Sequence, residues 1–269
     1  MKKYILMAAL AVGLTAAAQD FDNEPTLNFN KNEAQFTIGA RMMADAAYYH
    51  SDFTPLKSGG AITDARIRTS FSWRDWYLYA DFGFGGGKFS QKNIFAQWNR
   101  ENQKGGWNYA RAGYYNDPGS MARNTSLGSY HFISRPGSTM ALGVGRELGI
   151  SYKYQDRNWF ANQGVFTDHA YNEIQAGFNG ISVSGRWLYR PINDENQTLH
   201  LGINARFAHR GGGEVVNNVL KKTLTLGQAM ETYVDGNEDL VTAELPWVNN
   251  VINAGFEALY RCPKFFARG

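Results

Sequence analysis

The segment spanning residues 35–49, QFTIGARMMADAAYY, alternates residue by residue between apolar and polar or small side chains. Successive side chains of an extended strand point to opposite faces. One face would carry Phe36, Ile38, Ala40, Met42, Ala44, Ala46 and Tyr48. The other face would carry Arg41 and Asp45. Strands of soluble proteins average about 5–6 residues, so a strand this long indicates a bilayer on its apolar side and water on its polar side.

The first 18 residues have the layout of a secretory signal peptide. Lys2 and Lys3 precede the apolar run YILMAALAVGL, which is too short to span a bilayer, and Ala16 and Ala18 complete an A-x-A cleavage site. We therefore predict a signal peptide over residues 1–18 and a mature chain from Gln19. An uncleaved anchor is the alternative, although no stop-transfer pattern follows. Residues 19–34 are polar and rich in Asn, which predicts a disordered lead-in.

Composition narrows the class of protein further. After the signal peptide, no apolar run approaches the roughly 20 residues that a helical span needs. The 29 glycines, 14% aromatic residues and mean hydropathy of −0.43 are ordinary for a barrel with a wet interior and wet loops. A net charge of +3 argues against a general nucleic-acid binder. The single cysteine, Cys262, excludes an intramolecular disulfide.

The alternation recurs along the chain and predicts about ten strands. They cover residues 35–49, 62–73, 76–84, 89–99, 107–115, 147–154, 159–166, 181–189, 198–208 and 251–261. Short links and long links follow each other in turn, and the longest segments are 116–146 and about 209–246. This asymmetry is typical of an outer-membrane barrel with short periplasmic turns and longer external loops. Trp73 and Trp76 flank a short turn, where an aromatic girdle is expected. The fold class is therefore all-β, an antiparallel transmembrane barrel.

Arginines recur on the face that the alternation assigns to the interior. The inward set is Arg41, Arg66, Arg68, Arg111, Arg186, Arg206 and Arg261. A pore lined by arginine attracts anions, and the planar guanidinium suits phosphate because it can form two parallel hydrogen bonds. The same face also carries acids: Asp45, Asp64, Asp81 and Glu257. The alternative is therefore that the arginines form structural ion pairs across the wall, as Arg41 could with Asp45.

Several segments carry a family resemblance. They are DFGFGGGKFSQKNIF, AGYYNDPGSMARNTSLGSYHFISRPGS, ELGISYKY, ANQGVF and GRWLYRPINDENQTLHLG. With them the chain resembles the phosphate-selective porin O and P family of outer-membrane porins, in the form found in Bacteroidetes-like bacteria. The resemblance implies a barrel of about 16 strands, usually a homotrimer, in the outer membrane of a Gram-negative bacterium. It implies outer-membrane lipid and small anions such as phosphate as partners, and no cofactor.

The resemblance also implies that the third external loop folds into the lumen as a constriction. In this chain the segment 116–146 would be that loop. It offers Arg123, Ser126, Ser129, Ser134, Arg135 and Arg146, whose hydroxyl and guanidinium groups could replace an anion's hydration shell. The alternative is an external loop with ordinary solvated charges.

The chain departs from the family in its number of strands. It ends at Gly269 with CPKFFARG, where an eleventh strand would begin, and it lacks the terminal aromatic expected of a closing strand. We therefore expect residues 35–269 to form an incomplete barrel from a truncated gene, a fragment or a split reading frame. A smaller ten-stranded barrel is the alternative.

Two other functions are alternatives to an anion-preferring or general porin. A truncated barrel could be a non-conducting structural or adhesive remnant. An outer-membrane phospholipase would need an outward histidine beside a serine, whereas His200 faces inward. The stretch GFGGGK lacks the spacing of a phosphate-binding loop, and the five histidines are scattered, so no nucleotide or metal site is predicted.

Overall fold

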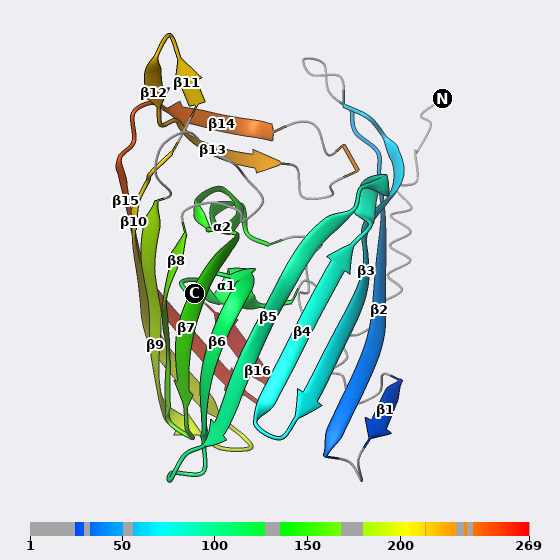
Figure 1. The fold of residues 1–269 in the computed structure, drawn as a ribbon, viewed down its shortest axis with the longest axis vertical. Coiled ribbons are helices and arrows are strands. Elements are labelled where there is room, and N and C mark those ends of the chain that lie inside the picture. The colour runs from blue at the N-terminus through cyan, green and yellow to red at the C-terminus, as the bar shows by residue number, and fades with distance from the viewer. Residues whose placement is uncertain are drawn as a thin grey trace.

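Twelve strands pair in chain order to form one antiparallel, strongly curved sheet in a computed structural model (Figure 1). The structure describes residues 25–29, 33–50, 56–126, 135–167, 180–212, 214–229, 234–235 and 239–268. The signal peptide predicted over residues 1–18 and the loop serines Ser129 and Ser134 lie outside these ranges.

The strands of the main sheet are, in order of pairing, β1 (Thr26–Phe29), β2 (Ala34–Ala47), β3 (Gly59–Trp73), β4 (Trp76–Gly83), β5 (Ser90–Glu101), β6 (Trp107–Asn116), β7 (Arg146–Gln155), β8 (Trp159–Thr167), β9 (Ile181–Asn193), β10 (Thr198–His209), β15 (Asn250–Cys262) and β16 (Phe265–Arg268). All ten predicted strands are confirmed, as β2 to β10 and β15. Among the described residues, β1 and β16 end the order of strands and do not pair with each other.

The two added strands are short. β1 pairs with β2 and lies within residues 19–34, where the composition predicts a disordered lead-in. The difference arises because an extended chain beside β2 can hydrogen-bond to the free edge of that strand, whatever its side chains are. β16 pairs with β15 across a two-residue turn at Pro263 and Lys264, so the eleventh strand expected after this turn begins in the structure.

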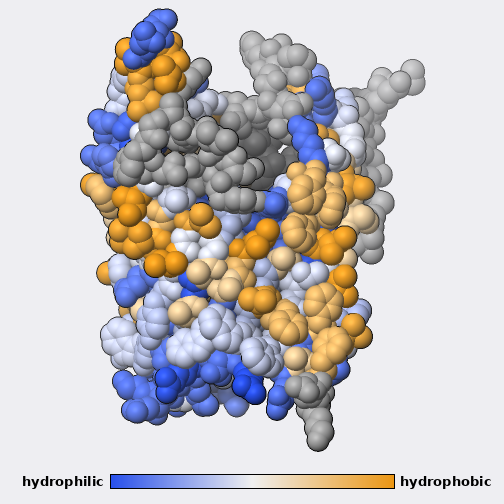
Figure 2. All heavy atoms as spheres, viewed as in Figure 1, coloured by the Kyte–Doolittle hydropathy of each residue, from blue (hydrophilic) through white to orange (hydrophobic). Residues whose placement is uncertain are grey.

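The apolar side chains of the strands lie on the outer surface. Along β2, Ile38 and Met42 are exposed, whereas Thr37 and Gly39 on the other face are buried. The same division holds in β7, where Leu148 and Ile150 are exposed. Figure 2 shows the result as a band of hydrophobic side chains across the middle of the molecule, with hydrophilic residues below it. The apolar side of the alternation is therefore the convex, lipid-facing side.

Aromatic side chains gather near the short turns. Cross-strand pairing places Trp73 opposite Trp76, and Trp76 opposite Trp98, on three consecutive strands. Trp159 and Tyr189 lie with ring centroids 4.6 Å apart on β8 and β9. Amphipathic rings are favoured at the boundary between lipid and water, so this end of the sheet has the girdle predicted from Trp73 and Trp76.

A β-bulge keeps the apolar and polar faces of β3 aligned with those of β2. Pairing between β2 and β3 shifts by one residue at Thr63, so Ile62 and Asp64 point to opposite faces although they are two residues apart. This bulge explains why the apolar positions change parity along the segment 62–73.

On β7 and β8, a Cβ at Gly149 would lie 2.3 Å from the ring of Phe166. The ring of Phe166 therefore covers this glycine, and any larger residue would displace it.

The long links lie at the end opposite the short turns. The link between β4 and β5 contains the short 3-10 helix η3 (Gly85–Gly87), and the link between β6 and β7 contains α1 (Met121–Asn124) and α2 (Gly137–Leu142). The link between β10 and β15 forms two hairpins: β11 (Glu214–Val216) with β12 (Val219–Lys221), and β13 (Leu224–Ala229) with β14 (Asp239–Leu245). No helix in the described parts of the chain is long and apolar enough to cross a membrane.

Two adjacent methionines on β2 test the assignment of faces. Met42 is exposed on the convex side, and Met43 lies on the concave side opposite Asp64. We expect Met42→Lys to lower the free energy of unfolding by as much as about 2–4 kcal/mol, the cost of a lysine facing lipid at the bilayer midplane. Met43→Lys should cost less, because its ammonium group would face water and a carboxylate.

The measurement is urea unfolding in phospholipid vesicles, followed by tryptophan fluorescence. Equal destabilisation by the two substitutions would contradict the assignment of the convex face to lipid.

Candidate functional site

The concave face carries the predicted arginines, because each occupies the strand position opposite to an exposed apolar neighbour. Arg41 lies between the exposed positions Ala40 and Met42, and Arg111 lies between Ala110 and Ala112. Six of the seven inward candidates are half-buried or buried. Arg261 is the exception: it is exposed and lies opposite Thr198 near the short-turn end, so it is not grouped with the others.

The first cluster of charges joins β2, β3 and β4. Arg66 forms ion pairs with Asp64, at 2.6 Å between Nε and Oδ1, and with Asp81, at 3.1 Å between Nη1 and Oδ2. Arg41 also pairs with Asp64. The alternative that Arg41 forms a structural pair is thus realised across strands, with Asp64 rather than with Asp45. Arg68 lies on the same face, opposite Asp81 in the strand register. Two guanidinium groups and two carboxylates make this cluster, called the β2–β4 cluster, neutral.

A second cluster is buried beneath the link between β6 and β7. Arg206 on β10 lies 2.7 Å from Oε1 of Glu147 and 3.6 Å from Oδ2 of Asp117. Ser182 donates a hydrogen bond to Glu147 at 3.2 Å, and Ser184 donates one to Asp117 at 2.8 Å. All five side chains are buried. We call this group the anchor cluster, because Asp117 belongs to the link and the other four residues belong to the wall.

Asp117 is the first residue after β6. Burial raises the pKa of its carboxyl group above the usual range, although the Gly119 N–H, the Ser184 hydroxyl and the Arg206 guanidinium all act in the opposite direction. The carboxyl group accepts a hydrogen bond from the Gly119 N–H at 2.7 Å as well as the one from Ser184. The start of the link is therefore fixed to β9 and β10 through one side chain.

A third cluster joins β9, β10 and β15. Glu257 lies 2.8 Å from Nη2 of Arg186 and 2.9 Å from Nε2 of His200. The three residues come from neighbouring strands, and Glu257 is buried between the other two. Arg186 is therefore neutralised within the wall, and His200 is held on the concave face by a carboxylate.

Arg111 and Arg146 differ from these arginines in having neutral partners. Arg111 donates to Oε1 of Gln97 at 2.9 Å, and its guanidinium carbon lies 3.9 Å from the centroid of the Phe95 ring. Arg146 donates to Oδ1 of Asn93 at 2.7 Å. Within the described part of the chain, no carboxylate lies within ion-pairing distance of either guanidinium. Neither positive charge is therefore neutralised by an ion pair with an acid in this part of the chain.

Arg146 is also placed differently from its predicted position. It is the first residue of β7, where it pairs with Asn116, and is not part of the link between the strands. The link is thus residues 117–145. Sequence alternation could not reveal this, because Gly143 and Gly145 precede the strand and interrupt the pattern.

The link from β6 to β7, residues 117–145, contacts both sides of the curved sheet. Its anchor cluster holds it to β9 and β10, while Nη1 of Arg41 on β2 donates to the Ser126 hydroxyl at 3.3 Å. In the order of the sheet, β2 and β9 are separated by six strands. A segment that reaches both must cross the concave face. We refer to it as the crossing loop.

Two of the predicted loop arginines support the crossing loop internally. Arg135 donates to the carbonyl oxygens of Ala122 and Thr125 at 3.0 and 2.9 Å, at the C-terminal end of α1. This position is favourable for a cation because the last helical carbonyls lack partners. Arg123 donates to the sulfur of Met140 in α2 at 3.4 Å. Both arginines therefore hold α1 and its surroundings together.

Sequence reasoning missed four residues of the anchor cluster: Asp117, Glu147, Ser182 and Ser184. Alternation offered a signal for three of them. Glu147 has the inward parity of β7, and Ser182 and Ser184 have the parity of Arg186 on β9. Asp117 lies beyond the strand, where parity gives no information.

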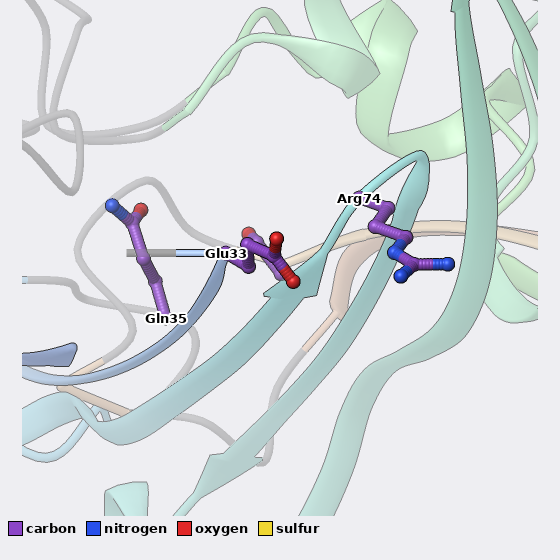
Figure 3. Close-up of a pocket in the computed structure, with 4 residues that line it drawn as sticks. Glu33, Gln35 and Arg74 are labelled. Carbon is purple, nitrogen blue, oxygen red and sulfur yellow. The ribbon is translucent and has the colours of Figure 1, made fainter. Parts of the chain in front are cut away.

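A separate open pocket of about 410 Å³ lies at the short-turn end (Figure 3). Glu33, Gln35, Ser72 and Arg74 line it. In the close-up, the side chain of Gln35 points away from that of Arg74. None of the predicted site residues lies there. In the described ranges, no group of three or more His, Cys, Asp or Glu side chains could hold a metal ion.

Comparison with known proteins agrees with this geometry. Residues 36–267 match the model of the family described as phosphate-selective porin O and P. Neither the comparison with curated proteins nor that with solved structures found a match. The matched residues cover β2 to β10, β15 and the crossing loop, which is most of the chain. The chain therefore belongs to the phosphate-selective porin O and P family of non-enzymatic outer-membrane porins.

Proposed function

We propose that the chain allows passive diffusion of small anions, such as phosphate, along the concave face of the sheet. The observation that carries this proposal is the contrast between paired and unpaired arginines. Arg41, Arg66, Arg186 and Arg206 have carboxylate partners, whereas Arg111 and Arg146 have neutral ones. The latter two supply the positive potential that an anion would meet.

Pairing matters because a neighbouring carboxylate cancels most of the field of a guanidinium. An anion near the β2–β4 cluster meets two positive and two negative charges, so it gains little there. An anion near Arg111 or Arg146 meets a cation with amide neighbours, and each guanidinium retains N–H donors that suit an oxyanion. Within the predicted arginine set, these two are therefore the residues that we assign to anion attraction.

The crossing loop supports a second part of the proposal. Because it reaches from β9 to β2 across the concave face, it would narrow a passage along that face. We assign the constriction to Ser126 and to the neighbouring part of the loop that includes the predicted Ser129 and Ser134. Arg123 and Arg135 would act indirectly, through the shape of α1.

The family is non-enzymatic, which excludes the phospholipase, and His200 is bonded to Glu257 on the concave face. A non-conducting structural or adhesive protein is the second candidate, because the described sheet is open between β1 and β16. The homotrimer that the resemblance implies stays a prediction.

Arg111→Gln and Arg146→Gln should each lower the anion-to-cation permeability ratio of the reconstituted protein. A unit charge about 10 Å from a permeating ion in water changes its energy by about 0.4 kcal/mol. This corresponds to about twofold in concentration for the anion and the reverse for the cation, or about fourfold in the ratio. The ratio is measured from the reversal potential in planar bilayers with a phosphate gradient.

Arg157→Gln is the matched control for these substitutions. Arg157 lies in the turn between β7 and β8, away from the crossing loop, so the ratio should stay unchanged. Selectivity for cations in the unaltered protein would overturn the anion proposal, and silent bilayers under all conditions would favour the non-conducting alternative.

Loosening the crossing loop should change conductance rather than selectivity. Ser184→Ala removes a buried hydrogen bond to Asp117, and Ser126→Ala removes the contact with Arg41. We expect the double variant to show larger and noisier single-channel currents and faster protease cleavage within residues 117–145. Each lost hydrogen bond weakens the attachment by about 1 kcal/mol.

The control for the loop is Ser58→Ala, which removes a hydroxyl that contacts Tyr49 in the link between β2 and β3. It should leave current and cleavage within residues 117–145 unchanged. Unaltered currents in the Ser126→Ala/Ser184→Ala variant would show that the crossing loop does not limit the passage.

A further inference from the structure

Aromatic side chains form a continuous group on the concave face, a position where water-facing polar residues are expected. Tyr77 and Tyr79 on β4, Phe95 on β5 and Tyr115 on β6 belong to it, and we call the group the aromatic wall. Ring centroids are 6.3 Å apart for Tyr77 and Tyr79, 5.2 Å for Tyr79 and Phe95, and 5.9 Å for Phe95 and Tyr115. The first two pairs are stacked, and the third is edge to face.

Strand register explains how these rings meet. Tyr77 pairs with Gln97, and Gln97 pairs with Arg111, so these three lie in one row across β4, β5 and β6. Tyr79 pairs with Phe95 in the next row toward the long links. The strands are neighbours in Figure 1. The aromatic wall is thus built on three adjacent strands, which are rigid elements of the fold.

Cations border the aromatic wall. The guanidinium carbon of Arg111 lies 3.9 Å from the Phe95 centroid and 5.2 Å from that of Tyr115. The Lys153 ammonium group on β7 lies 3.9 Å from the centroid of Tyr109, one row toward the short turns. Aromatic faces attract the charged forms of arginine and lysine and so help to hold these side chains in place. An anion that approaches the rings therefore meets positive charge beside an apolar surface.

The members of the aromatic wall differ in how deeply they are buried. Tyr115 is buried, and its ring centroid lies 5.6 Å from that of Phe166. Its hydroxyl donates a hydrogen bond to Ser151, so its role is structural. Tyr77, Tyr79 and Phe95 are half-buried on the concave side and keep part of their surface exposed. Apolar ring surface that faces water is unfavourable, and a flat solute that covered it would be stabilised.

We propose that the aromatic wall, together with Arg111 and Lys153, binds organic anions that carry a planar ring next to a phosphate group. The ring would stack against Tyr77 and Tyr79, and the phosphate would take hydrogen bonds from the guanidinium of Arg111. This inference rests on the proposed function, because it places the site along the same concave face. It distinguishes the chain from a pore that attracts inorganic anions alone.

Titration calorimetry of the full chain in detergent, with phenyl phosphate and inorganic phosphate as probes, tests the proposal. Stacking on one aromatic side chain corresponds to about tenfold in affinity, so phenyl phosphate should bind about tenfold more tightly than inorganic phosphate. Cyclohexyl phosphate, which has the same charge but no planar ring, should fall between them. Equal affinity for phenyl phosphate and inorganic phosphate would overturn the proposal.

Variants separate stacking from charge. Tyr79→Leu should weaken phenyl phosphate binding by about tenfold and leave inorganic phosphate within about twofold, whereas Tyr79→Phe retains the ring and the affinity. Tyr77→Leu provides the same test if Tyr79→Leu disturbs the sheet, which circular dichroism would reveal. Arg111→Gln should weaken both probes. Tyr152→Leu, on the convex side of β7, is the matched control and should change neither. A normal phenyl phosphate affinity in both leucine variants of the wall would overturn the stacking role.

Bilayer currents keep this inference separable from the proposed function. A chain that conducts phosphate but does not favour phenyl phosphate would overturn the aromatic site and leave the porin function intact. A chain that binds phenyl phosphate selectively but never conducts would overturn the porin function and leave the site intact.

Discussion

Backbone hydrogen bonding in a medium without water is the constraint on which this structure depends. Hydrocarbon offers no partner to an N–H or C=O group, so strands within a bilayer must pair with one another along their length. Antiparallel pairing from β2 to β15 meets this requirement and forces successive side chains to opposite faces. Met42 and Arg41 therefore meet opposite solvents although they are neighbours in the chain. The division between a lipid-facing side and a charged side follows from the backbone rather than from any single contact.

The positive charge of the concave face depends on which arginines have carboxylate partners more than on how many arginines there are. A half-buried guanidinium loses hydration, and a nearby carboxylate compensates for part of this loss. The β2–β4 cluster, the anchor cluster and the pair of Arg186 with Glu257 illustrate this compensation. Arg111 instead has an aromatic face and an amide beside it, which stabilise the cation without cancelling its charge. The same residue can therefore be part of the wall and keep the positive charge on which the proposed anion passage depends.

Much of the fold could be predicted from the sequence, because the side chains of a strand alternate between its two faces and the sequence pattern therefore has the same period of two. It placed ten strands and gave the faces of Arg41, Arg66 and Arg186 correctly. It could not give cross-strand partners, since parity is unchanged when a strand slides by two residues, and so the choice of Asp64 over Asp45 by Arg41 was not foreseeable. The hairpins β11–β12 and β13–β14 were missed because their strands, of three to seven residues, are too short to show a sustained alternation. Asp117 was missed because it lies just beyond a strand end.

The attachment of the crossing loop at two distant strands has a mechanical meaning. The contacts at Ser126 and Asp117 join β2 to β9 by a path shorter than the sheet between them, much as a chord joins two points of an arc. Shortening or lengthening a chord changes the curvature of the arc that it spans. The curvature of the sheet and the position of the crossing loop are therefore coupled. A change in one would shift the other.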